Sequence, residues 1–165
     1  MGIMTKLSKN FSLEEFYVSE SYPKLAEKIK RTKLDMQKAH QMAQTLLQPI
    51  RDQFQTPIKI NSGKRSKILN LVIGGVPSSE HRWIGFACAC DWEFVNPNEY
   101  KLLMKAFDWA GNNLKHNFGQ MIIYLDKNKV PEFIHISLVT QKHKGQMLVK
   151  FQEDYFLYEN WKNRK

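Results

Sequence analysis

The sequence predicts an α+β fold in which helices come first and a mainly antiparallel sheet follows. Helical periodicity is strongest before residue 55, whereas runs with a period of two begin at residue 57 and recur to residue 151. The links between the later runs are short, which favours hairpins over the long crossovers that parallel strands require. The chain has 165 residues, no internal repeat and no Gly/Ser-rich linker, so it predicts a single domain (1–165) with a core over about residues 10–152 and a basic C-terminal tail.

The N-terminal region carries the first helix signals. Ser12, followed three residues later by Glu15, has the pattern of a capping box. Pro49 lies inside the next helical run and should kink its final turn, because proline cannot donate the helical hydrogen bond. The apolar residues that define this run recur at spacings of mostly three and four; they are Met36, Ala39, Ala43, Leu46, Leu47, Ile50 and Phe54.

A second long helix and five strands are expected in the remainder of the chain. The helix should begin at Asn96, with Pro97 in its first position, and stop near Gly111. Its buried stripe is expected to contain Tyr100, Leu103, Met104, Phe107 and Ala110. The strands are expected at residues 57–61, 86–92, 120–125, 133–139 and 146–151.

Composition narrows the class of protein. Apolar residues make up 42% of the chain and charged residues 25%, which is ordinary globular usage and argues against disorder. No apolar run is long enough for a membrane helix, and the first residues lack the apolar centre of a secretory signal. We therefore expect a protein made in a host cytoplasm, with no membrane partner. The net charge of +9 favours polyanionic partners, but no aromatic–basic motif of a specific nucleic-acid reader is present.

Cysteine and histidine placement limits the chemistry further. Cys88 and Cys90 lie two apart with no second cysteine pair, which excludes a structural zinc ribbon. His40 lies near the polar flank of the long helix, and His116 and His143 lie in charged loops, so all three are expected to be solvated surface residues.

His81, Asp91 and His135 are the strongest chemical candidates. His135 alternates with the isoleucines of the run FIHIS, so it should leave the core and line a cleft. Two histidines and an aspartate from separate segments can supply the N, N and O ligands of a catalytic zinc, which keeps a fourth position for water. Glu132, three residues before His135, could then act as a general base. Spacing alone does not separate this arrangement from coincidence.

A longer motif adds to this hypothesis. The run SGKRSKILNLVIGGVPSSEH, residues 62–81, resembles the zinc D-Ala-D-Ala carboxypeptidase family, which includes phage endolysins, vancomycin-resistance dipeptidases and, by fold, hedgehog signalling domains. Its phage and bacterial members read approximately S-G-Y-R-S, L-N, V-G-G-V and S-x-H in this order. Here Lys64 replaces the tyrosine and Ile73 the first valine. With NFSLEEF, LQPIRDQF and FIHIS, the resemblance runs from residue 10 to about residue 139 and implies a hedgehog/DD-peptidase-like fold.

The resemblance implies a role for each matching residue. Glu132 falls on the catalytic base, and Ser79 on a serine expected to touch the substrate or orient the first ligand. Arg65 falls on the arginine that binds substrate by polarising the scissile carbonyl and stabilises the oxyanion, a role suited to the fixed donors of a guanidinium. The residues that fall on the zinc ligands are His81, Asp91 and His135.

The spacing between the first two implied ligands departs from the family pattern. Asp91 lies ten residues after His81, as if three residues were inserted. An ungapped register would put Cys88 at the ligand position, and thiolate also binds zinc. We expect Asp91 to be the ligand, because Ala89-Cys90-Asp91 keeps the family ending Ala-x-Asp and inserted residues can bulge outward. The remaining alternative is that the insertion abolishes the site.

The expected function is therefore that of a monomeric zinc metallopeptidase that hydrolyses peptidoglycan, as a D-Ala-D-Ala carboxypeptidase or an endolysin-like endopeptidase. Bacterial peptidoglycan would be its partner and Zn²⁺ its cofactor. Without a signal peptide, such a protein would reach the wall after release by a holin or host lysis, or as part of a virion. The alternative function is a catalytically inactive wall-binding or virion structural module of the same fold. Nucleic-acid binding rests on charge alone.

Overall fold

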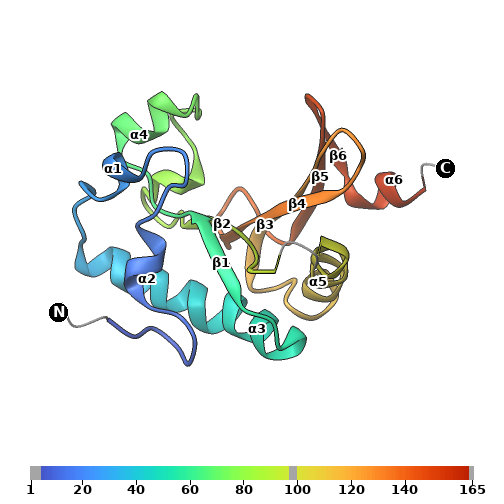
Figure 1. The fold of residues 1–165 in the computed structure, drawn as a ribbon, viewed down its shortest axis with the longest axis horizontal. Coiled ribbons are helices and arrows are strands. Elements are labelled where there is room, and N and C mark those ends of the chain that lie inside the picture. The colour runs from blue at the N-terminus through green and yellow to red at the C-terminus, as the bar shows by residue number, and fades with distance from the viewer. Residues whose placement is uncertain (1–4, 97–99, 164–165) are drawn as a thin grey trace.

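A six-stranded sheet organises the chain (Figure 1). The computed structural model describes residues 5–96 and 100–163. The strand order is β1-β2-β4-β3-β5-β6. The strands are β1 (Ile58–Ser62), β2 (Ala89–Phe94), β3 (Phe118–Leu125), β4 (Pro131–Leu138), β5 (Gln146–Phe151) and β6 (Asp154–Leu157).

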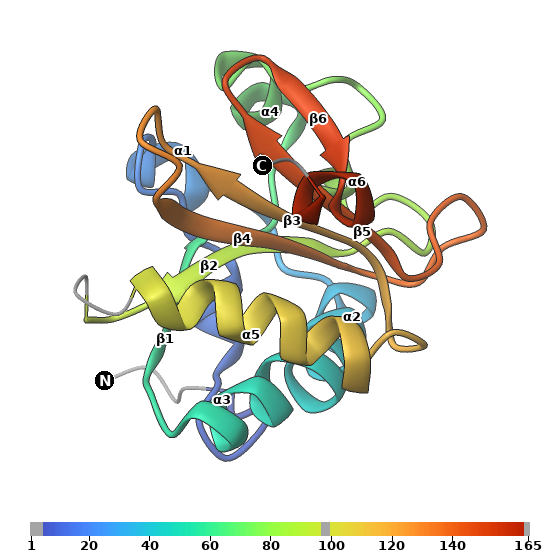
Figure 2. The ribbon, with the colours of Figure 1, turned by 90° about the vertical axis from the view of Figure 1, so that its right-hand side faces the viewer.

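Helices cover one side of this sheet. Figure 2 shows α2, α3 and α5 on one side, with α4 and the β5–β6 hairpin toward the other. The helices are α1 (Pro23–Ala26), α2 (Lys33–Met42), α3 (Gln48–Phe54), α4 (Lys67–Val72), α5 (Tyr100–Asn113) and α6 (Tyr158–Lys162). Two 3₁₀ turns, η1 (Leu13–Phe16) and η3 (Glu80–Arg82), and one π turn, η2 (Ala43–Leu47), complete the set. None of the helices within the described ranges is long and apolar enough to cross a membrane.

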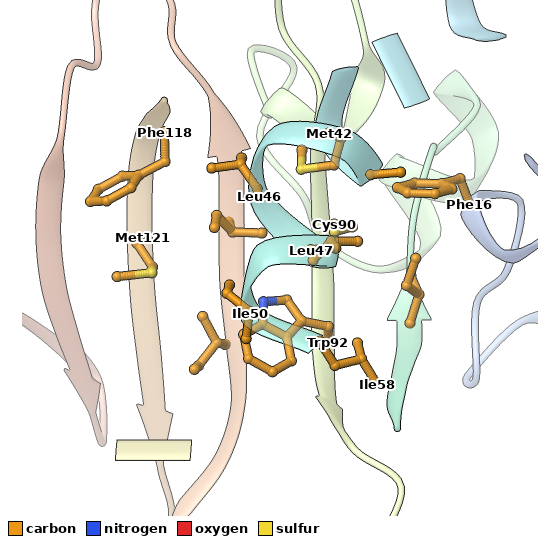
Figure 3. Packing of buried hydrophobic residues seen from close by; sticks show 14 of the residues in the cluster. Phe16, Met42, Leu46, Leu47, Ile50, Ile58, Cys90, Trp92, Phe118 and Met121 are labelled. Carbon is orange, nitrogen blue, oxygen red and sulfur yellow. The ribbon is translucent and has the colours of Figure 1, made fainter. Parts of the chain in front are cut away.

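The expected long helix is present but irregular. Its segments α2, η2 and α3 are continuous, and the π turn lies directly before Pro49. A widened turn is a common accommodation where proline removes a helical hydrogen bond. Figure 3 shows the buried face of this helix against the sheet, with Leu46 and Ile50 facing Trp92 and Met121. Met36, expected in the core, is instead 37% exposed. At the N-terminus the capping box of Ser12 and Glu15 is confirmed.

The second long helix, α5, packs across β2, β3 and β4. Leu103, Phe107 and Ala110 are buried as expected, whereas Tyr100 is 38% exposed. The expected start at Pro97 lies outside the described residues. Gly111 does not end the helix, which continues to Asn113. A Cβ on Gly111 would lie 2.4 Å from the sulfur of Met147, so glycine permits the close approach of β5.

The five expected strands are present with shifted ends, but the sheet is mixed. β5 runs parallel to β3, and the other neighbouring strands are antiparallel. The reason is that β4 occupies one edge of β3, so the chain reverses after β4 and pairs with the opposite edge. The expected basic tail also differs, because residues 154–162 form β6 and α6. Tyr158 secures this segment by stacking edge-on against Phe107 at 5.0 Å and donating a hydrogen bond to Asp108 at 2.6 Å.

Candidate metal centre

Two adjacent strands place a carboxylate opposite a histidine. On β4, Ile134 and Ile136 point into the core, so His135 points to the other face of the sheet. On β2, Cys90 and Trp92 are core residues for the same reason, and Asp91 points with His135. The β2–β4 register pairs Asp91 directly with His135. His135 Nδ1 consequently lies 2.9 Å from Asp91 Oδ1.

His81 reaches this pair from η3. Its Nε2 lies 3.1 Å from Asp91 Oδ1 and 3.2 Å from His135 Nδ1. The other ring nitrogen, Nδ1, lies 2.8 Å from the carbonyl oxygen of Gly63 and donates to it, which leaves Nε2 without a proton. A Cβ on Gly63 would lie 2.0 Å from the carbonyl oxygen of Phe16, so only glycine fits where this acceptor is held.

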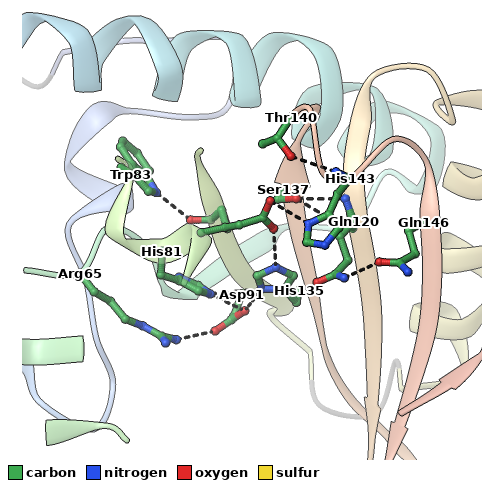
Figure 4. A network of polar contacts seen from close by, with 12 residues as sticks. Arg65, His81, Trp83, Asp91, Gln120, His135, Ser137, Thr140, His143 and Gln146 are labelled. Carbon is green, nitrogen blue, oxygen red and sulfur yellow. Dashed lines mark hydrogen bonds and ion pairs between the residues drawn. The ribbon is translucent and has the colours of Figure 1, made fainter. Parts of the chain in front are cut away.

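These three side chains fit a zinc site. Their ligand atoms all lie within 4.8 Å of one another, and the three residues are 4–9% exposed (Figure 4). Two imidazole nitrogens and one carboxylate oxygen form a donor set that zinc accepts, and three protein ligands are typical of catalytic zinc sites. The fixed tautomer of His81 also matches the usual arrangement of a metal-binding histidine.

The electrostatics of the cluster favour a cation. Burial raises the pKa of Asp91, but the neighbouring His81 and His135 outweigh burial and hold that pKa well below its usual range. Burial lowers the pKa of His81. Burial also lowers the pKa of His135, but the hydrogen bond to Asp91 and the nearby Glu80 carboxylate outweigh it and raise that pKa to about 9. In the absence of a metal, His135 therefore carries a proton and a positive charge. A divalent cation bound by the three side chains would replace that charge.

The insertion between His81 and Asp91 forms an outward loop. Trp83 anchors its base: the indole Nε1 donates to the carbonyl of Ala89 at 3.0 Å, and Lys38 Nζ donates to the Trp83 carbonyl at 2.6 Å. Beyond this anchor, Ile84 and Phe86 are 60% and 81% exposed. The sequence predicted a strand from residue 86, but β2 starts at Ala89, because the extra residues loop out before it.

The loop leaves Asp91, not Cys88, beside the two histidines. Cys88 and Cys90 are fully buried in the hydrophobic core, and burial raises the pKa of each thiol. A thiol in such surroundings is the protonated form, which is a poor metal ligand.

Arg65 supports the carboxylate from the other side. Its guanidinium donates to Asp91 Oδ2 at 3.1 Å, while Asp91 Oδ1 faces the histidines. The same guanidinium donates to Ser62 Oγ at 3.0 and 3.1 Å, and the Arg65 backbone N–H donates to the carbonyl of His81 at 2.7 Å. The arginine is thus fixed on both sides and oriented toward the cluster.

A cavity of about 540 Å³ opens onto the cluster. Arg65, Ser79 and the three candidate ligands line it, together with residues from the segment after β4. A larger cavity, of about 700 Å³, lies between α2 and residues 138–144 and is lined by none of these groups. The smaller cavity is therefore the one that opens onto the candidate metal site.

Glu80, and not Glu132, lines this cavity together with the carboxylate of Asp91. Glu132 is exposed and is not among the residues that line the cavity. It lies three residues, or about 10 Å of strand, from His135, at a shift in the β3–β4 register. The structure thus does not bring Glu132 to the cluster. Glu80 Oε2 lies 3.8 Å from His135 Nε2.

His143 is the other residue that the sequence did not assign to the site. It was expected on the solvated surface, but its side chain is 17% exposed, lines the cavity and has Nδ1 3.1 Å from Glu80 Oε1. The loop between β4 and β5 folds back over the cavity and brings it there. Since 63 positions separate His143 from Glu80, no local pattern in the sequence marks the pair.

A comparison with protein-family models gives a match to the family described as Peptidase M15, over residues 9–136. The matched range includes all three candidate ligands and ends before His143. The comparisons with curated proteins and with solved structures gave no match.

Proposed function

The chain belongs to the Peptidase M15 family, whose members are zinc-dependent peptidases, and from this premise we propose that it hydrolyses amide bonds of bacterial peptidoglycan. The observation that carries the proposal is the convergence of His81, Asp91 and His135 at the floor of an open cavity. The net charge of +9 suits a substrate held in an anionic wall. The activity is that of a carboxypeptidase on D-Ala-D-Ala ends or of an endolysin-like endopeptidase.

The three clustered residues would hold the metal through His81 Nε2, Asp91 Oδ1 and His135 Nδ1. Zinc in this site would supply Lewis acidity, which polarises a carbonyl group and lowers the pKa of water. The protein's own contribution to that chemistry is orientation. The Gly63 carbonyl fixes the tautomer of His81, and Arg65 fixes the plane of the Asp91 carboxylate.

Arg65 has a second role in the proposal. It lines the cavity beside Asp91 and is 12% exposed at its side chain, so its charge acts where little water screens it. Negative charge develops on the carbonyl oxygen when an amide is attacked, and a fixed guanidinium stabilises that charge.

Glu80 is the proton acceptor in this proposal, in place of Glu132. Burial raises the pKa of Glu80, but the neighbouring side chains of His135, Ser137 and His143 outweigh it and lower that pKa to about 2, so the carboxylate is ionised at neutral pH. It can accept the proton of the attacking water and then deliver it to the nitrogen of the leaving amine.

The test is Glu80→Gln, with Glu132→Gln as the matched control. Glu80→Gln should keep one zinc per chain and lose about 10²–10⁴-fold in the rate of peptidoglycan hydrolysis, whereas Glu132→Gln should keep both zinc and rate. Mass spectrometry of the digested peptidoglycan identifies the bond, because the fragment masses differ between carboxypeptidase and endopeptidase products.

Other outcomes contradict parts of the proposal. Loss of rate in Glu132→Gln alone would restore Glu132 as the base. A purified wild-type chain that binds no stoichiometric zinc and releases no fragments would favour an inactive wall-binding or virion structural module.

A further inference from the structure

Glu80 is held by a residue from outside the family-matched region. Its position next to His81 on η3 fixes its backbone, but a glutamate side chain has three rotatable bonds between backbone and carboxylate. One carboxylate oxygen, Oε2, faces His135 Nε2 at 3.8 Å, which is longer than a hydrogen bond, and Ser137 is a further polar neighbour of this carboxylate. The short contact is on the other oxygen, where His143 Nδ1 lies 3.1 Å from Oε1. At this distance the Nδ1–H of His143 can donate a hydrogen bond to the carboxylate oxygen of Glu80.

The loop that carries His143 is itself closed. The His143 backbone N–H donates to Thr140 Oγ1 at 3.0 Å, and its carbonyl accepts from the backbone N–H of Thr140 at 3.0 Å. Two residues later, the N–H of Gly145 donates to the carbonyl of Phe118 at 2.9 Å, which ties the loop to β3. Figure 4 shows Thr140 and His143 together above the ligand cluster. The imidazole is thus held by the loop before any substrate enters.

We infer that His143 is a positioning residue that fixes the rotamer of Glu80 through Nδ1–H···Oε1, an inference that rests on the proposed function. By occupying Oε1, His143 leaves Oε2 on the His135 side of the carboxylate for the transferred proton. Without this donor, the carboxylate would turn to other partners, and the reactive geometry would form in fewer molecules. The side chain of His143 bonds to Glu80 and is not part of the cluster of three candidate ligands, so we expect the metal site to form without it.

The experiment compares three substitutions at position 143. In His143→Asn, the amide N–H donor lies close to the position that Nδ1 occupies in histidine. In His143→Gln, the longer side chain places the donor closer to the position of Nε2. His143→Ala should lower kcat by about 10–100-fold with little change in KM and with full zinc content, which is the usual scale for partners of active-site groups. His143→Asn should restore most of kcat, and His143→Gln should not. His116→Ala, at an exposed histidine outside the cavity, should behave as wild type.

A double-mutant cycle distinguishes a role of His143 through Glu80 from a general role of His143 in stabilising the fold. Because His143 acts through Glu80, His143→Ala should cost nothing further in a Glu80→Gln background. A full additional loss in that background would overturn the inference, as would wild-type kcat in His143→Ala or loss of zinc from it. If Glu80→Gln itself retained full activity, the proposed function of Glu80 would fail.

A third experiment measures the hydrogen bond between His143 and Glu80 without measuring catalytic activity. In the metal-free protein, ¹⁵N spectra of the imidazoles should show His143 with its proton on Nδ1, and Glu80→Ala should shift that signal. An unchanged His143 signal in Glu80→Ala would overturn the hydrogen bond whether or not the protein is an active peptidase.

Discussion

The chain up to residue 136 and the chain after it build the same cavity in different ways. The first part, which matches the peptidase family, supplies the ligand cluster from η3 and from the central strands β2 and β4. The second part supplies Lys142, His143 and Tyr155 to the wall, from the β4–β5 loop and the edge strand β6. The first set follows a recognisable motif with one insertion. The second set follows no motif and reaches the cavity only because the chain folds back.

The two parts also differ in burial and in their place in the sheet. Asp91 and His135 face each other across paired central strands and are at most 9% exposed. Tyr155 lies on a strand at the sheet edge and is 54% exposed. A metal site needs fixed geometry and therefore belongs on the inner strands, whereas an edge hairpin can vary without disturbing the ligands. We therefore expect the metal to bind in the first part, and we expect the second part to shape the cavity around the metal site.

The largest expected effect tests the ligand set in the first part. Asp91→Ala should abolish stoichiometric zinc binding and hydrolysis, because it removes one of three protein ligands. Cys88→Ser should keep both, since Cys88 is buried in the core away from the cluster. Zinc content by elemental analysis and the rate of peptidoglycan hydrolysis are the measurements. Zinc loss in Cys88→Ser with retention in Asp91→Ala would give the site to the thiol.

The contrast between Asp91 and Cys88 also shows what the sequence could predict. The sequence predicted Asp91 as the ligand and an outward course for the inserted residues, and the structure has both arrangements. The anchor at the base of the loop depends partly on Lys38, which lies 45 positions before Trp83 and therefore cannot be read from a local pattern.

The place of Glu132 depends on a local irregularity. Residues three apart on a regular strand point to opposite faces, but the β3–β4 register shifts at Glu132, and the sequence pattern does not show this shift. His143 is different, because its place depends on β5 pairing with the far edge of β3. That pairing is a parallel contact between distant segments, and periodicity indicates strands without indicating their partners.

The second prediction concerns the protonation of the ligand cluster in the first part of the chain, which the pH dependence of zinc affinity measures. Since the pKa of His135 is about 9 in the metal-free protein, zinc must displace one proton from it at any lower pH. Apparent zinc affinity should therefore rise about tenfold per pH unit between pH 6 and 8 and level off as pH passes about 9. Competition with a chromophoric chelator across this range gives the slope.

Glu80→Gln provides the contrasting arm of this measurement. Removing the Glu80 charge takes away one of the groups that raise the pKa of His135, so affinity should level off at lower pH. Glu132→Gln should leave the profile unchanged. A flat profile from pH 6 to 8 in the wild type would mean that His135 is already neutral before the metal binds.

The smallest expected effect tests the second part of the chain as a substrate wall. Tyr155 lines the cavity, its hydroxyl lies 3.4 Å from that of Tyr124, and Lys150 Nζ lies 4.5 Å from its ring centroid. Tyr155→Ala should raise KM about fivefold, the equivalent of about 1 kcal/mol of lost aromatic contact, with unchanged zinc content. Tyr155→Phe, which keeps the ring, should lose less. Tyr100→Ala is the matched control, because Tyr100 is 38% exposed on α5 and does not line the cavity. An unchanged KM in Tyr155→Ala would remove the edge hairpin from substrate binding and leave recognition to the matched part of the chain.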